Sequence, residues 1–198
     1  MPNPTTAAEA EVRGRCRDRP PPPTPIAQYH GPYMTTFLLI RHGAAEDPRS
    51  GLPDKDRALT EEGWKKTRAA MRGLVKLGLV PQQGVSSPAR RAVETMACLQ
   101  EAVLKATKES LPFTVWEGLL PEGDAVEADA WLRELARGLE GKGTVALASH
   151  QPFLGELVYW LTGESLEIRK ASCSVVELKG ERWRFKKHYR PSELRAQA

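Results

Sequence analysis

The chain has 198 residues, with 29 basic and 25 acidic side chains and a net charge of +4. Its composition, 40% hydrophobic and 27% charged, is that of an ordinary soluble protein. No run reaches the roughly 18 apolar residues of a membrane helix. The three cysteines are far apart and lack CxxC spacing, so they indicate neither a disulfide framework nor a zinc site. We therefore expect a cytoplasmic protein with no membrane anchor, and so small a net charge is weak support for nucleic-acid binding.

Residues 1–33 differ in composition from the rest of the chain. They contain half of the 16 prolines, including the run Pro20–Pro23, and few large apolar side chains. Such a segment cannot bury enough surface to offset the entropy of ordering it. We expect a disordered tail or a wrongly assigned start, with Met34 as the true beginning. The alternative is a tail that docks on an acidic surface or in an SH3-like groove.

Strand and helix patterns alternate after Met34. The apolar run Thr36–Ile40 is typical of a buried parallel strand. Thr60 is suited to cap a helix, and the apolar residues after it follow one helix face. We expect strands over 36–40, 84–86, 113–116, 144–148 and 174–178, and a last strand that contains Trp183 and Phe185. We expect helices over 60–78, 89–106, 125–138 and 152–161.

This order of elements predicts an α/β fold with a single mostly parallel sheet, helices on both faces and an antiparallel C-terminal hairpin. We expect the folded domain to span residues 34–190, with residues 191–198 as a C-terminal tail. The hairpin turns at 179–181. The basic residues of its second strand form one exposed face or steer an acidic protein partner; they are Arg182, Arg184, Lys186 and Lys187.

Polar residues follow three of the expected strands, and a parallel sheet binds its ligands beyond the carboxyl ends of its strands. Arg41 and His42 follow the first strand, His150 follows the fourth, and a pair, Arg90 and Arg91, begins the helix after the second. Arginine forks match phosphate oxygens, and a helix N-terminus attracts anions. A neutral imidazole is a competent nucleophile toward phosphorus. The strand ends therefore predict a phosphoryl site that requires no metal and no cofactor.

Four stretches of the chain form a larger pattern: 39–43 (LIRHG), 57–63 (RALTEEG), 87–95 (SPARRAVET) and 148–155 (ASHQPFLG). In this order they resemble the histidine phosphatase superfamily, and within it the SixA-like phosphohistidine phosphatases. The resemblance covers residues 34–184 and implies a phosphoglycerate mutase-like fold. This chain is as short as the members without inserted caps, so that the loops 44–57 and 117–125 are left to shape the pocket.

The resemblance implies a role for each matched residue. His42 would be the nucleophile that becomes phosphorylated, and Arg41 would hold the phosphate beside it. In the pattern S-P-x-x-R-A the phosphate arginine is Arg91, and Arg90 occupies a variable position. His150 would be the second histidine of the pocket and would hydrogen-bond the phosphoryl oxygens.

Many members of the family also protonate the leaving group with an acid that follows the third strand. The candidates here are Glu117, Glu122 and Asp124, of which Glu117 is favoured by its position. SixA-like proteins often lack a clear acid of this kind. The P–N bond of phosphohistidine is labile and its imidazole can accept a proton itself, so that a phosphomonoester needs the acid more.

These residues predict a phosphatase that hydrolyses phosphohistidine on a protein through a covalent intermediate on His42. One alternative is a small-molecule phosphomonoesterase or phosphoramidase of the same fold, and another is a phosphoprotein- or nucleotide-binding module without turnover. The expected partner is a phosphorylated protein or a small phosphorylated substrate, and neither nucleic acid nor membrane is expected. By residue type His42, His150 and Asp47 could bind a metal ion, but their spacing matches no zinc signature.

Other polar residues have two interpretations. Arg57 either lines the pocket or pairs with Asp54 or Asp56. His30 falls in the proline-rich segment and His188 on the last strand, and we expect both to be structural or to face solvent.

Overall fold

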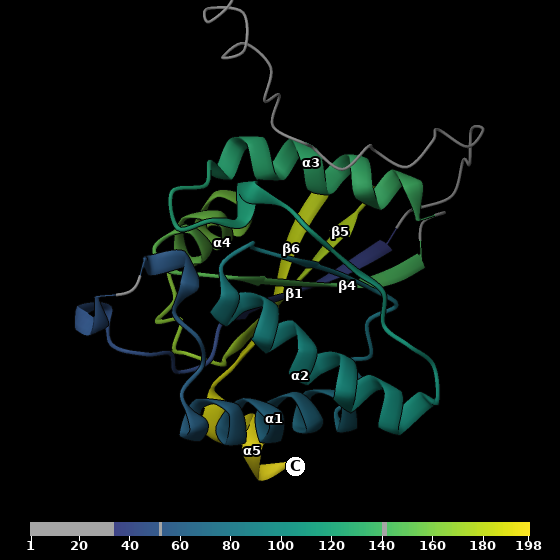
Figure 1. The fold of residues 1–198 in the computed structure, drawn as a ribbon. Helices are drawn as coiled ribbons and strands as arrows, with labels where there is room; N and C mark the ends of the chain where they lie inside the picture. Colours follow the sequence, from purple (N-terminus) through teal and green to yellow (C-terminus); the bar gives the residue numbers. More distant parts are fainter. Residues whose placement is uncertain (1–33, 52, 140–141) are drawn as a thin grey trace, which may run out of the picture.

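The computed structural model describes residues 34–51, 53–139 and 142–198. The expectations for the proline-rich segment 1–33 fall outside these described residues. A six-stranded sheet of order β3-β2-β4-β1-β5-β6 lies at the centre of the molecule (Figure 1). The strands are β1 (Met34–Arg41), β2 (Gln83–Ser86), β3 (Phe113–Val115), β4 (Lys142–Ser149), β5 (Cys173–Lys179) and β6 (Arg182–Tyr189).

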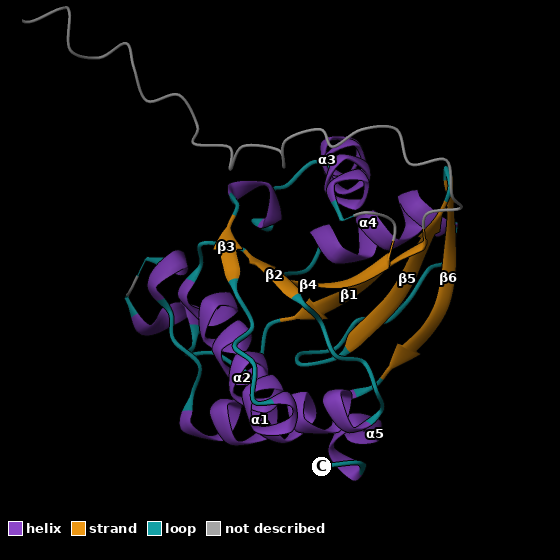
Figure 2. Ribbon diagram, turned by 90° about the vertical axis from the view of Figure 1, so that its right-hand side faces the viewer, coloured by secondary structure: helices purple, strands orange, loops and turns teal. Residues whose placement is uncertain are grey.

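Helices cover both faces of this sheet, as the sequence predicts. Figure 2 shows α3 and α4 on one face, and α1, α2 and α5 on the other. The α-helices are α1 (Glu61–Lys76), α2 (Arg90–Thr107), α3 (Ala125–Gly138), α4 (Phe153–Thr162) and α5 (Pro191–Ala196). Short 3-10 helices occur in the connections: η1 (Pro48–Ser50), η2 (Asp54–Asp56) and η3 (Glu117–Leu119).

The pairing of the strands confirms the predicted mixture of parallel and antiparallel neighbours. β1 pairs with β4, and β2 pairs with β3 and β4, all in parallel. β5 runs antiparallel to β1, and β6 antiparallel to β5, which forms the C-terminal hairpin. The parallel strands β1, β2 and β4 therefore end at the same edge of the sheet.

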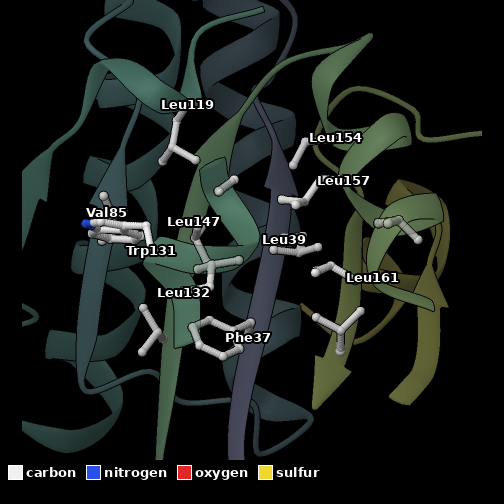
Figure 3. Close-up of a cluster of buried hydrophobic side chains, with 14 of the residues drawn as sticks. Phe37, Leu39, Val85, Leu119, Trp131, Leu132, Leu147, Leu154, Leu157 and Leu161 are labelled. Atoms are coloured by element: carbon white, nitrogen blue, oxygen red, sulfur yellow. The ribbon is translucent and has the colours of Figure 1, made fainter. Parts of the chain in front are cut away.

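Successive residues of the central strands point into two separate cores. Phe37 and Leu39 of β1 pack with Leu147 against α3 and α4 (Figure 3). Leu38 and Ile40, which alternate with them, pack against α1 and α2. This alternation follows from the two-residue period of a strand, and it explains why residues 37–40 of β1 are all apolar instead of alternating with polar residues.

Strands β1 to β5 and helices α1 to α4 begin and end within two residues of the predicted bounds. The helix start at Thr60 is confirmed, because the Oγ1 atom of Thr60 accepts a hydrogen bond of 3.0 Å from the backbone N–H of Gly63. This bond satisfies one of the free donors of the first helical turn, and the same kind of side-chain cap begins α3 at Asp124.

The C-terminal residues differ from the tail expected for 191–198. They form α5, in which Leu194 is completely buried. The helix lies against α1, where a side chain at Gly73 would collide with the backbone carbonyl of Leu194. The packing of α5 on α1 depends on Gly73, which is far away in the sequence. The local sequence of 191–198 therefore does not indicate that this segment packs against the domain.

The two cysteines in the described part of the chain, Cys98 on α2 and Cys173 on β5, are buried free thiols. Burial raises the pKa of the Cys98 thiol to about 12. Cys16 lies outside the described residues. Across the described ranges, no helix combines the length and the apolar character needed to cross a membrane.

Candidate active site

The carboxyl ends of β1, β2 and β4 meet at one edge of the sheet, because Ile40 and Ser86 both lie beside Ala148. A pocket of about 600 Å³ opens at this edge. Its lining comes from the end of β1, the connection 45–57, the start of α2, residues 121–122 and the turn that precedes α4. The three predicted strand ends thus contribute to one cavity.

His42 lies in this pocket directly after β1, with 6% of its surface exposed. Its Nδ1 atom is 2.7 Å from the carbonyl oxygen of Gly43, which can only accept a hydrogen bond. Nδ1 therefore carries the proton, and Nε2 keeps its lone pair. Burial, followed by the nearby His150, lowers the pKa of His42 to about 3, so the ring is neutral at pH 7.

The turn that carries His42 is held by backbone contacts on two sides. The N–H of His42 donates to the carbonyl of Ser149 on β4 over 3.0 Å. The N–H of Gly43 donates to Oγ1 of Thr95 on α2, also over 3.0 Å. A Cβ atom at Gly43 would collide with the Thr67 hydroxyl of α1, so the glycine after His42 is required by close packing.

His150 faces His42 from the end of β4, and the two ring centroids are 4.9 Å apart. Its Nε2 atom is 2.8 Å from the hydroxyl oxygen of Ser87, at the end of β2. Its Nδ1 atom is buried without a hydrogen-bond partner among the residues that the structure describes. Burial, followed by the charge of Arg91, lowers the pKa of His150 to about 3.

The two arginines of the pocket come from different elements, β1 and α2. Arg41 ends β1; its Nη1 donates to the carbonyl of Ile168 over 2.8 Å, and its buried Nε lacks a partner in the described structure. Arg91, in the first turn of α2, is almost fully buried and its Nε is 3.3 Å from Nε2 of His42. Arg90 instead points outward and pairs with Glu94 over 2.9 Å.

The structure separates the three candidates for the acid. Glu117, which the sequence favours, is exposed on η3 and lies outside the pocket lining. β3 ends at Val115, and the 3-10 helix that follows carries the chain past the pocket before residues 121–122 return to it. Asp124 caps α3 through the N–H groups of Val126 and Glu127. Of the three candidates, Glu122 alone is among the described residues that line the pocket.

Both interpretations of Arg57 hold in the connection 45–57. Arg57 lines the pocket and also binds the Asp54 carboxylate, with its Nε 3.0 Å from Oδ1. Asp47 binds Arg49 over 2.8 Å at the mouth of the pocket. The alternative metal set of His42, His150 and Asp47 does not assemble, since no group of three such ligands occurs in the described part of the chain.

Sequence reasoning passed over Ser87 and Thr95, and it considered Asp54 only as a partner of Arg57. Ser87 and Thr95 lie inside a matched stretch, so the motif itself could have identified them. Asp54 binds Arg91, which is 37 residues away along the chain. The two acidic residues in 54–56 are the only local feature of the sequence that indicates this contact.

The comparisons with known proteins agree with this geometry. A family model described as the histidine phosphatase superfamily (branch 1) matches residues 37–125. An uncharacterized protein of Picosynechococcus sp. is 32% identical over 156 residues, which make up 77% of this chain and 89% of that protein. A phosphohistidine phosphatase SixA homolog of Haemophilus influenzae is 29% identical over 151 residues, 72% of this chain and 86% of that protein. The solved structure of the protein histidine phosphatase SixA complexed with tungstate is 25% identical, with a TM-score of 0.71 over 80% of this chain and 99% of its own.

Proposed function

The chain belongs to the histidine phosphatase superfamily, and we propose that it is a SixA-like phosphatase that hydrolyses phosphohistidine on a protein. In this proposal His42 is the nucleophile and carries the phosphoryl group as a covalent intermediate. One observation carries it: the proton of His42 is held at Nδ1 by the Gly43 carbonyl, while the lone pair of Nε2 points into the pocket and accepts a hydrogen bond of 3.3 Å from Nε of Arg91. The reaction requires neither metal nor cofactor.

In the first step, Nε2 of His42 attacks the phosphorus atom of the substrate. A P–N bond forms to His42 as the substrate's own P–N bond breaks, and the bonding electrons go to the departing imidazole, which takes up a proton from water. The ring of His42 becomes positively charged as it is phosphorylated. The Gly43 carbonyl, 2.7 Å from Nδ1, stabilises that charge without removing the proton.

The donors around His42 suit the oxygens of a phosphoryl group. Arg41 and Arg91 neutralise charge that would repel a nucleophile, and they stabilise the equatorial oxygens during transfer. The backbone N–H of Ala89 donates to the hydroxyl oxygen of Ser87, which leaves the hydroxyl hydrogen free to donate to Nε2 of His150. In this proposal the hydroxyl donates to Nε2, so that the proton of His150 is on Nδ1, the atom without a partner in the described structure, and is given to a phosphoryl oxygen.

In the second step, water attacks the phosphorus atom of phosphorylated His42. A P–O bond forms, the bond between phosphorus and Nε2 breaks, and its electrons return to Nε2. The proton released by water remains on the phosphate product. The neutral imidazole is restored because burial keeps the pKa of His42 at about 3.

A second activity, on small phosphomonoesters, is favoured by the position of Glu122. An alkoxide leaving group is far more basic than imidazole and benefits from a proton donor. Glu122 lies in the pocket lining, and Lys170 at the same rim offers a positive charge to a second anionic group. In this alternative Glu122 donates the proton to the leaving oxygen, and His42 keeps its role.

Hydrolysis of a panel of substrates tests both candidates. We expect the purified chain to release phosphate from a phosphohistidine protein faster than from phosphoserine peptide or sugar phosphates. His42→Ala abolishes release from every substrate, whereas His188→Ala, on β6 and away from the pocket, retains it. A chelator leaves the rate unchanged.

Three results would contradict the proposal. Activity of His42→Ala equal to wild type would remove the covalent mechanism. A preference for sugar phosphates would favour the phosphomonoesterase, and tight binding of phosphoprotein without any release of phosphate would favour the binding module.

A further inference from the structure

The guanidinium of Arg91 is bound by a residue that the mechanism above does not use. Its Nη1 donates to the backbone carbonyl of Asp54, and its Nη2 donates to the Asp54 carboxylate over 2.7 Å. Asp54 belongs to η2, in the connection between β1 and α1. One residue thus contacts Arg91 through both its main chain and its side chain.

These contacts occupy one edge of the guanidinium, and a second edge faces His42. The group presents five N–H bonds in a fixed plane: Nη1 and Nη2 share the end edge, and Nε and Nη2 share the side edge. Asp54 binds the end edge. The side edge is turned toward His42, with Nε 3.3 Å from the Nε2 lone pair. A phosphoryl group on Nε2 would meet this side edge, where two parallel N–H bonds can bind two oxygens.

Asp54 is itself held in place from the other side. Its Oδ1 accepts hydrogen bonds from Nε and Nη2 of Arg57, and Nη1 of Arg57 donates to the carbonyl of Glu46. The Arg57 side chain is 11% exposed, compared with 60% for Asp54. A carboxylate can accept from two guanidinium groups at once, whereas an amide would turn an NH₂ group toward one of them. The hydrogen bonds from Arg57 and Arg91 lower the pKa of Asp54, so it is charged at neutral pH.

We infer that Asp54 is a positioning residue that, clamped by Arg57, aims the side edge of Arg91 at the phosphoryl group on His42. The inference rests on the proposed function. It assigns to the connection 45–57 a role in building the phosphate site itself, in addition to shaping the entrance. It also implies that Asp54 stays in place when phosphate binds, because phosphate and Asp54 use different edges of Arg91.

Replacing Asp54 with asparagine tests the inference, and Asp56→Asn is the matched control. Asp56 is exposed on the same 3-10 helix, and its side chain has no hydrogen bond or ion pair within the described ranges. We expect Asp54→Asn to lower kcat/KM for an aryl phosphate by about 10- to 100-fold, the scale of misplacing a reacting group. We expect it to weaken binding of inorganic phosphate, measured as its inhibition constant. Asp56→Asn leaves both close to wild type.

A double-mutant cycle separates positioning from a general effect on structure. The ammonium group of the Arg91→Lys variant lacks the two parallel N–H bonds of a guanidinium edge. Asp54→Asn therefore loses most of its effect on kcat/KM in this background, with a coupling of about tenfold between the two substitutions. Asp54→Ala, which keeps the backbone carbonyl, provides a second variant if Asp54→Asn folds poorly. Equal unfolding temperatures for wild type and both variants show that the effect lies in the site.

Several results would overturn the inference. If Asp54→Asn and Asp56→Asn are both as active as wild type, Asp54 does not position Arg91. If Asp54→Asn binds phosphate more tightly, Asp54 competes with phosphate for Arg91 and does not orient it. An equal loss in the wild-type and Arg91→Lys backgrounds would mean that Asp54 acts elsewhere. A wild-type chain without any hydrolysis contradicts the proposed function instead.

Discussion

The two walls of the pocket are built in different ways. The strand-end wall carries Arg41, His42 and His150 after buried strands, and backbone or buried side-chain hydrogen bonds hold its turns. The loop wall consists of the connection between β1 and α1 and of residues 121–122, where most of the charged side chains are exposed. The sheet edge therefore fixes its polar side chains through buried contacts, whereas the connections present exposed side chains at the entrance of the pocket.

The largest predicted effect belongs to the arginine that joins the two walls. Arg91→Ala removes the fork beside His42 and leaves Asp54 without its partner, so we expect kcat to fall by about 1,000-fold. Arg90→Ala is the control, because Arg90 is exposed and pairs only with Glu94 in the described structure. Steady-state hydrolysis of an aryl phosphate measures both. A similar loss in the two variants would mean that the inward position of Arg91 has no special part in the reaction.

A smaller effect, confined to poor leaving groups, tests the loop wall. Glu122→Gln removes a proton donor from the pocket, so we expect hydrolysis of an alkyl phosphate to slow by about 100-fold and that of phosphohistidine to change little. Glu117→Gln, outside the pocket, changes neither rate. The ratio of the two rates in each variant is the measurement. Equal losses on both substrates would remove Glu122 from the role of acid.

The last prediction concerns stability instead of rate, and it belongs to the strand-end wall. Burial lowers the pKa of both His42 and His150 to about 3 from the ordinary 6.5. Below pH 6.5 the unfolded chain therefore binds protons that the folded chain does not. As the pH decreases from 6.5 toward about 3, the free energy of unfolding therefore decreases by about 1.4 kcal/mol per pH unit for each histidine.

Denaturant unfolding at a series of pH values measures this slope. His150→Asn removes one of the two groups, so the free energy of unfolding depends less steeply on pH than in wild type. An unchanged slope would show that His150 is protonated in the folded chain, which would conflict with its role as a neutral donor.

The strand-end wall could be predicted from the sequence for a physical reason. A short apolar run such as 36–40, ended by polar residues and a glycine, is typical of a buried strand, and a parallel sheet places the residues that follow its strands at one edge. The positions of Arg41, His42 and His150 at this edge follow from that pattern. The choice of Arg91 over Arg90 came from a family motif, and the structure turns Arg91 inward.

The loop wall could not be predicted in the same way, because its positions depend on distant partners. η2 is held where Asp54 meets Arg91, 37 residues away, and no local pattern encodes that pair. Glu117 has the expected place in the sequence, but η3 leaves it exposed and brings Glu122 to the pocket instead. α5 was missed for the same reason, since Leu194 packs on a glycine of α1.

In the proposed reaction the phosphoryl group is bound covalently to Nε2 of His42, and this intermediate can be trapped. The chain is mixed rapidly with a phosphohistidine protein, quenched in alkali, where phosphohistidine survives, and digested for mass spectrometry. We predict one added phosphoryl group on the peptide that contains His42, and none in His42→Ala. Rapid turnover with His42 unmodified at every time point, or with the phosphoryl group on another residue, would contradict the account.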